Sequence, residues 1–395
     1  MMEVNIKEFL EVMKKIQKNL IDFLEHGDNN EEQYQNLIQI FEDIKIHDNQ
    51  FKIKPLLYLI LKISNNHHRE PAFFSKIEKI LLLFKDDIKK YFPNNELFHI
   101  FKSNKRLLLF LLEEKIMIFD EFIIKRIVNN EKYIESKYPQ YFQPEIQPFI
   151  NEKWFPKYDK NDWRLKYNNW VEDLKKELQD GFYEIRKIGE NDDEICKLIQ
   201  KDLIEEFIIY INKNCYPVNS TINPSIYETN NFLLKKQNIT LIEYAAFFGS
   251  IQIFNYLRQN GAKLESSLWL YAVYGKDPEI INFLEENKIQ NIKEKNTFFA
   301  KNVSFEQIFK ESIKCHHIDV ANYIRNNYLQ NEKEYLNDTL ISGLKYYNFM
   351  FMQCNIENET SFCYLCKYDY YVPIFILFKY TDIEINKKII CTVIF

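Results

Sequence analysis

The sequence predicts an all-α protein assembled from pairs of short helices, on three observations. Apolar residues recur at spacings of three and four in one segment after another, which is the pattern of a helix with one buried face. Short polar or glycine-containing breaks separate these segments. The most regular stretch, residues 240–263, contains two such helices joined by a turn at Gly249.

The first helix of that stretch has a defined start and end. Thr240 and Glu243 have the spacing of a capping box, in which each side chain bonds the backbone amide of the other residue. Ala245 and Ala246 give the helix a thin face that lets another helix approach closely. Gly249 is expected to end it, because glycine adopts the left-handed conformation at little cost.

The second helix follows at once. Ile253, Phe254 and Leu257 form an apolar stripe at helical spacing, and Gly261 closes the helix after Asn260. Residues 240–263 therefore predict a helical hairpin.

This hairpin resembles an ankyrin repeat, which has a threonine-capped first helix with paired alanines, a glycine turn and a second helix ending in Gly-Ala. Leu241 and Glu243 stand where the family usually has proline and histidine. The resemblance implies a solenoid of stacked repeats whose class of activity is binding other proteins. The residues at family positions are Thr240, Ala245, Ala246, Gly249, Tyr256, Leu257, Gly261 and Ala262.

Weaker copies flank the strong unit. In residues 266–288, Ala272 and Gly275 stand 26 positions after Ala246 and Gly249. The units at 240–264 and 266–288 are the best matches. In three further units, the residues that take the place of the turn glycine are Asp202, His316 and Asp369.

The spacing of these turns is uneven. His316 lies 41 residues after Gly275, and Asp369 lies 53 residues after His316, against about 33 in the family. Insertions are therefore expected at 290–304 and 330–359. The carboxy-terminal half resembles the divergent ankyrin arrays of families expanded in parasitic protists.

The amino-terminal region, residues 1–136, is expected to be helical as well. Its apolar spacing predicts helices over 4–25, 32–44 and 55–63, and further helices up to residue 112. Residues 97–115 have the outline of a degenerate repeat, with Asn104 near the place of the turn glycine. The region is either a set of degenerate repeats or a helical cap.

Residues 137–175 differ from their surroundings and are expected to connect the amino-terminal region to a divergent repeat region at 176–390. Prolines break any helix here, among many Tyr, Phe and Trp residues. Because so much aromatic surface is rarely left in water, residues 137–170 are expected to pack as an irregular strap. The alternative is that 137–170 binds a partner, since Tyr and Trp are common interface anchors.

Charge and length exclude several classes. At 395 residues, the chain exceeds one ordinary core, so two domains or an elongated solenoid are expected. The net charge is −5 with both signs interspersed, which gives no electrostatic case for nucleic acid. The longest apolar runs fall short of the roughly 20 residues that a membrane-spanning helix needs.

The cysteines and the end of the chain complete the outline. Seven dispersed cysteines, an odd number, and no signal peptide favour an intracellular, cytoplasmic protein. We expect a monomer. Residues 387–395 form an apolar end, which either folds back as a cap or marks a truncated array, the favoured interpretation.

The sequence offers little support for catalysis. The seven glycines lack the close spacing of phosphate-binding loops, and no acid–base pair is singled out, so we expect neither an enzyme nor a cofactor. The loop carrying His67 and His68 is expected to be solvated. A metal site or enzyme using Cys315, His316, Cys363 and Cys366 is a remaining alternative, although buried cysteine is also an ordinary core residue.

The predicted function is non-catalytic protein binding through the concave face of the stack. The alternative is a structural adaptor that binds through 137–170. Phe248 and Tyr274 precede turn glycines, at positions that are often polar in the family, so their aromatic character is the more informative observation. The predicted contact residues are Tyr244, Phe248, Lys263 and Glu265 in the strong unit, and Trp269, Tyr274 and Lys276 in the next.

Overall fold

The protein is all-α. The computed structural model describes residues 6–27, 31–48, 50–69, 72–149, 177–178, 180–289, 303–329, 332–352 and 359–380. Regular structure within these ranges is helical, apart from one isolated antiparallel bridge between Thr221 and Thr240. No helix in them is long and apolar enough to cross a membrane.

The chain divides into two compact units. One contains residues 1–84 together with 245–395, and the other contains residues 85–244, so that the boundary falls inside α17 (Leu241–Phe248). The predicted boundaries at 136 and 175 do not coincide with this division. A helical pattern shows which face of a segment is buried, but not which distant segment covers it.

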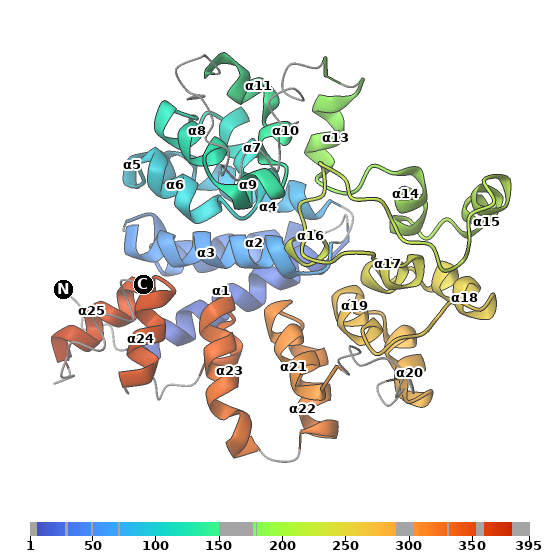
Figure 1. Ribbon diagram of the computed structural model, residues 1–395. Coiled ribbons are helices and arrows are strands. Elements are labelled where there is room, and N and C mark those ends of the chain that lie inside the picture. The colour runs from blue at the N-terminus through green and yellow to red at the C-terminus, as the bar shows by residue number, and fades with distance from the viewer. Residues whose placement is uncertain are drawn as a thin grey trace, which may run out of the picture. The chain divides into compact units, whose positions relative to one another are not determined.

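The first unit combines four amino-terminal helices with the carboxy-terminal hairpins (Figure 1). The amino-terminal elements are α1 (Ile6–Glu25), α2 (Glu31–Asp43), η1 (Ile46–Asp48), α3 (Gln50–Asn66) and α4 (Phe73–Leu83). The others are α18 (Ile251–Gln259), α19 (Leu268–Gly275), α20 (Pro278–Glu286), α21 (Phe305–Lys314), α22 (Ile318–Tyr328), α23 (Glu332–Tyr346), η5 (Phe349–Phe351), α24 (Glu359–Lys367) and α25 (Tyr371–Tyr380).

Two elements of the structure differ from the sequence prediction. Helix α3 begins five residues before Pro55, which therefore lies inside the helix and forgoes the hydrogen bond to the Phe51 carbonyl. The segment 330–359, expected to be an insertion, contains α23 and η5. The other expected insertion lies mostly outside the described residues, as does the apolar end at 387–395.

The hairpins share one turn geometry. The predicted turn residues Gly249, His316 and Asp369 have left-handed φ values of 68°, 61° and 61°, and Tyr347 has 55°. After each of them, the next amide bonds the carbonyl five residues back, as Ser250 bonds Ala245 at 2.9 Å. This is the Schellman motif, which ends a helix and turns the chain sharply.

The α19–α20 turn also contains a left-handed residue, but not at its glycine. Lys276, not Gly275, is the left-handed residue, with a φ of 55°. Gly275 is required by space, since a Cβ there would lie 2.1 Å from the Ala246 carbonyl oxygen and 2.8 Å from the Gly249 nitrogen. The α17–α18 turn and α19 therefore approach each other backbone to backbone.

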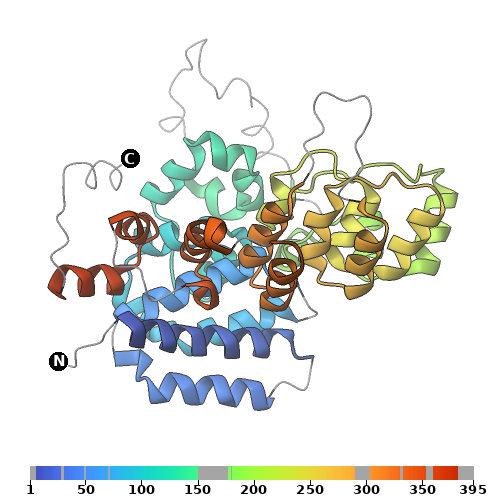
Figure 2. The same ribbon diagram turned by 90° about the horizontal axis from the view of Figure 1, so that it is seen from below.

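Helix α1 lies alongside α2 (Figures 1 and 2) and contacts α4, η5 and α25. Its apolar face contains one buried polar residue, Gln17, whose side-chain amide donates to Asn348 Oδ1 at 2.8 Å and to His316 Nδ1 at 3.1 Å. The Gln17 carbonyl oxygen accepts from the Phe349 amide at 2.7 Å, and the other ring nitrogen of His316 donates to the Tyr346 carbonyl at 3.0 Å. These bonds hold α1 against the turns of two hairpins.

Helix α3 covers the same side of the hairpins. The Tyr58 hydroxyl donates to Asp369 at 2.6 Å, and its ring stacks on Tyr347 at 5.0 Å. The three left-handed residues His316, Tyr347 and Asp369 are thus contacted by α1 or α3. Much of the turn surface of the hairpins is occupied by the chain's own amino-terminal segment.

The second unit is built from shorter helices. They are α5 (Lys85–Tyr91), α6 (Asn94–Phe101), α7 (Lys105–Glu113), α8 (Glu121–Val128), α9 (Glu131–Glu135), α10 (Tyr138–Tyr141), α11 (Gln143–Ile146), η2 (Gln147–Phe149), α13 (Phe182–Ile188), α14 (Glu194–Gln200), α15 (Ile204–Lys213) and α16 (Asn231–Leu234). The α14–α15 turn has the predicted left-handed residue, Asp202, with a φ of 50°. Asn104, which was predicted to lie near the place of a turn glycine, caps α7 by accepting from the Leu107 amide at 3.0 Å.

The predicted capping box lies at the end of this unit. The Thr240 amide donates to the Glu243 carboxylate at 3.0 Å, and the Glu243 amide donates to the Thr240 hydroxyl at 3.4 Å. The box is confirmed, and it starts α17.

The described part of the aromatic insert is packed inside the second unit. The side chains of Tyr138, Tyr141 and Phe142 are buried, and the Tyr141 hydroxyl donates to the Arg186 carbonyl at 2.6 Å. Arg186 in turn pairs with Glu145 at 2.9 Å. These residues form core rather than a binding surface, while 150–176 lie outside the described residues.

Candidate functional site

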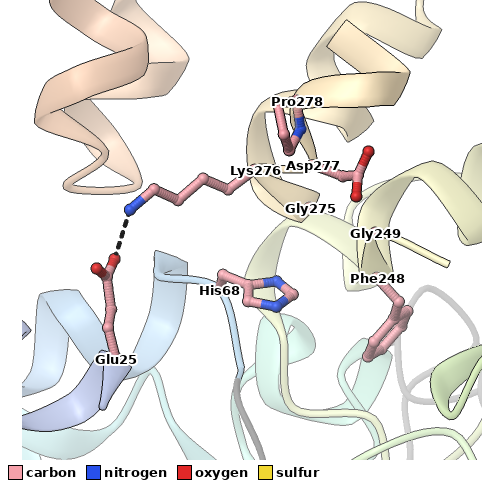
Figure 3. Close-up of a pocket in the computed structure, with 8 residues that line it drawn as sticks. All are labelled: Glu25, His68, Phe248, Gly249, Gly275, Lys276, Asp277 and Pro278. Carbon is pink, nitrogen blue, oxygen red and sulfur yellow. Dashed lines mark hydrogen bonds and ion pairs between the residues drawn. The ribbon is translucent and has the colours of Figure 1, made fainter. Parts of the chain in front are cut away.

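A pocket of about 390 Å³ opens in the first unit (Figure 3). Its walls come from the end of α1, the loop after α3, the α17–α18 turn and the α19–α20 turn. The lining residues are Glu25, His68, Phe248, Gly249, Gly275, Lys276, Asp277 and Pro278.

An ion pair closes one side of the pocket. Glu25 is the last residue of α1, and its Oε1 lies 2.8 Å from Nζ of Lys276 (Figure 3). The left-handed backbone at Lys276 turns its side chain away from α19, and a second carboxylate, Asp319, lies 3.4 Å from the same Nζ. Asp277 is already committed, because its side chain caps α20 by accepting from the Ile280 amide at 2.9 Å.

The pair is electrostatically strong. Burial disfavours the charged form of Glu25, yet the His67 ring and the Lys276 ammonium together hold the pKa of Glu25 at about 2. Burial also opposes the charge of Lys276, but the bond to Glu25 keeps the pKa of Lys276 above its usual value. Both groups are therefore charged at neutral pH.

Two buried histidines stand behind Glu25. His67 Nδ1 donates to the Cys315 carbonyl at 2.8 Å, and its Nε2 lies 3.1 Å from Glu25 Oε1 but is not aligned for a hydrogen bond. The ring of His317 lies 4.7 Å from that of His67. Glu25, His67 and His317 each offer one possible ligand atom, a carboxylate oxygen or a ring nitrogen, and these three atoms lie within 4.8 Å of one another.

His68 has a different environment from His67. It lines the pocket between Glu25 and Phe248 in the view of Figure 3. Burial and the neighbouring His67 lower the pKa of His68 to about 4. His68 is therefore neutral at pH 7 and presents a polar ring to the pocket without adding charge.

Three predicted contact residues lie in the core. Tyr244, Trp269 and Tyr274 are 0%, 1% and 1% exposed, so the prediction that they contact a partner does not fit their positions. The two tyrosine hydroxyls bond other residues of the chain: Gln200 donates to the Tyr244 hydroxyl, and the Tyr274 hydroxyl donates to Glu311, both at 2.9 Å. Their aromatic character serves packing, as in the stack of Tyr274 on Phe247 at 4.9 Å.

The other four predicted contact residues are accessible in part. Phe248 and Lys276 come together in the pocket, although they belong to different hairpins. Lys263 and Glu265 form an exposed ion pair of 2.9 Å between α18 and α19. Such surface pairs contribute little to stability.

The metal site suggested by Cys315, His316, Cys363 and Cys366 does not assemble. Both ring nitrogens of His316 are engaged, one by Gln17 and the other by the Tyr346 carbonyl. Within the described ranges, the only grouping of three suitable side chains is Glu25, His67 and His317. The sequence prediction was also wrong for His67, which is 2% exposed rather than solvated.

Sequence reasoning missed Glu25, His67 and His68 as site residues, and it did not bring His317 together with them. The doublets at 67–68 and 316–317 are a visible signal, but their separation of about 250 positions hides their meeting.

No model of a known protein family matches this chain, and comparison with curated proteins and with solved structures found no match.

Glu25→Gln is expected to lower the free energy of unfolding by about 1–2 kcal/mol at pH 7, because a side chain that remains 32% exposed is partly screened by water. A carboxyl whose pKa is lower in the folded chain stabilises it above the unfolded pKa of 4.5 and loses that effect as the pH falls toward 2. The difference between variant and wild type should therefore be full above about pH 5 and shrink below it.

The measurement is urea denaturation of both proteins at a series of pH values in EDTA. Comparison at each pH cancels the contributions of groups common to both proteins. A difference that stays constant down to pH 3 would contradict the assigned pairing.

Proposed function

We propose that this protein is a non-catalytic protein-binding scaffold, built from stacked helical hairpins of the ankyrin type. The recurrence of one turn geometry carries the proposal. The resemblance placed turns at Gly249, His316 and Asp369, and all three have the same left-handed residue followed by the same five-residue hydrogen bond. A series of like hairpins is the architecture of repeat proteins, which present an extended surface to a partner.

Close approach of successive hairpins also supports stacking. Gly275 of α19 lies against the Ala246–Gly249 backbone, and Phe247 stacks on Tyr274 beside it. The first contact joins small residues, and the second joins an aromatic pair. Contacts of both kinds let one repeat unit bury its face on the next.

The binding surface that we propose is centred on the pocket. The turns at His316, Tyr347 and Asp369 are covered by α1 and α3, whereas the α17–α18 and α19–α20 turns open into the pocket. Phe248 offers an apolar wall, beside the ion pair of Lys276 and Glu25. A partner would pack an apolar side chain against Phe248, with Lys263 and Glu265 as polar contacts nearby in the chain.

Phe248→Ala is expected to weaken partner binding at least about fivefold, because an aromatic wall of a pocket is a typical binding hot spot. The measurement is a quantitative pull-down from native cell extract with mass-spectrometric identification, followed by titration of the partner obtained. Phe375→Ala is the matched control, since Phe375 is exposed in the same unit but outside the pocket. Loss of binding with Phe375→Ala and retention with Phe248→Ala would sink the proposed surface.

A further inference from the structure

The histidine cluster behind the pocket is not explained by partner binding. Glu25 ends α1, His67 follows α3 directly, and His317 immediately precedes α22. Three elements from distant parts of the chain thus deliver one ligand atom each to a common point, within 4.8 Å of one another.

His317 provides the clearest indication of a ligand-binding site. Its side chain is 0% exposed, and neither ring nitrogen has a hydrogen-bond partner among the described residues. A neutral imidazole carries one donor and one acceptor, and burying either without a partner is unfavourable. A bound ion would satisfy the acceptor nitrogen.

His67 is oriented as metal-binding histidines are. Its Nδ1–H group donates to the Cys315 carbonyl at 2.8 Å, which fixes the ring and leaves Nε2 directed toward Glu25. A backbone carbonyl on the second ring nitrogen is the usual support of a metal ligand. Nε2 lies 3.1 Å from Glu25 Oε1 without being aligned to donate to it, so a cation could be bound by both atoms.

We propose that Glu25, His67 and His317 bind a first-row divalent transition-metal ion of the class represented by Zn²⁺. Two imidazole nitrogens and one carboxylate oxygen are a common donor set for this class, with a fourth position left open. Ligand atoms about 2.1 Å from a tetrahedral ion lie about 3.4 Å apart, so the three side chains need only a small closure. Because Glu25 also lines the pocket, the ion has a route from solvent.

Lys276 competes with the ion for Glu25. Its ammonium lies 2.8 Å from the Oε1 atom that faces His67, and Asp319 at 3.4 Å offers it another partner. Metal binding requires Lys276 to move toward Asp319. Removing the ammonium should therefore strengthen metal binding. If the ion pair of Lys276 and Glu25 were purely structural, its removal would not raise the affinity for metal.

The test is equilibrium titration of the EDTA-treated full chain with Zn²⁺, with bound metal measured by mass spectrometry and the visible absorption of bound Co²⁺ as a second readout. We expect one ion per chain. His317→Phe should weaken binding at least tenfold, and Lys276→Met should tighten it at least threefold. His26→Ala, which removes an exposed histidine next to Glu25, should leave the affinity unchanged.

Thermal unfolding with and without Zn²⁺ checks that each variant folds and that metal stabilises only the binding-competent proteins. If His317→Phe does not fold, Glu25→Gln and Lys276→Met decide, since they must shift the affinity in opposite directions. The proposal is overturned if wild type and Lys276→Met bind no stoichiometric metal, or if a folded His317→Phe binds as tightly as wild type.

Discussion

Replacing Gly275 by alanine is expected to lower the free energy of unfolding of the first unit by about 3 kcal/mol or more. The new Cβ would lie 2.1 Å from the Ala246 carbonyl oxygen and 2.8 Å from the Gly249 nitrogen. Both are backbone atoms that cannot rotate away, so α19 must separate from the α17–α18 turn. Overpacking of this kind typically costs about 1–3 kcal/mol, and contact with rigid backbone belongs at the upper end.

Thermal unfolding of the full chain measures the effect, as a fall of roughly 6–12 °C in the midpoint of the first unit. Two other glycines calibrate it. Gly27 has open space around it and no left-handed φ, so its alanine variant should be close to neutral, while Gly261, open but with a φ of 85°, should cost about 1–2 kcal/mol. A midpoint for Gly275→Ala within about 1 °C of wild type would refute the close approach of the two hairpins.

Replacing Gln17 by leucine is expected to destabilise the first unit by about 3–5 kcal/mol. The substitution keeps the size of the side chain but removes the partners of His316 Nδ1, Asn348 Oδ1 and the Phe349 amide. Each buried group left without a partner costs about 1–3 kcal/mol, and the added apolar contact of leucine offsets only part of the sum.

Denaturant titration of the full chain measures this loss. Gln39→Leu is the control, because Gln39 lies on the exposed face of α2 and its side chain donates to Asp43, so its replacement should change stability by less than about 0.5 kcal/mol. Equal effects of the two substitutions would show that Gln17 is not part of a buried network.

Local features of the fold were predictable because each depends on residues that are close together in the sequence. The capping box of Thr240 and Glu243 is one example. The left-handed turns at His316 and Asp369 are another, since they were placed by their register with Gly249 although neither is glycine. The turn at Tyr347 was missed, because α23 lies in a segment that the uneven spacing assigned to an insertion.

The folding of the amino-terminal helices onto the hairpins was not predictable from one sequence. The amphipathic pattern of α1 identifies a buried face but is the same whichever segment covers it. Gln17 shows the difficulty, because a lone glutamine in an apolar stripe is indistinguishable from a solvent position until Asn348 and His316 are placed beside it.

The candidate site was predictable only in part. Phe248 and Lys276 were chosen for their places near hairpin turns, and both line the pocket. Tyr244, Trp269 and Tyr274 were misassigned, because a large aromatic residue near a turn serves a core as well as a surface. Glu25, His67 and His317 depend on the folding of distant segments, which no spacing rule describes.

The meeting of the amino-terminal segment with the hairpins is the central claim, since both the pocket and the metal cluster depend on it. Zero-length carbodiimide cross-linking of the native full chain, followed by peptide mass spectrometry, tests it most directly. The 2.8 Å pair of Glu25 and Lys276, each partly exposed, should yield a cross-linked peptide, as should the 2.6 Å pair of Lys310 and Asp338 in the same unit. Detection of the second cross-link without the first would contradict the account.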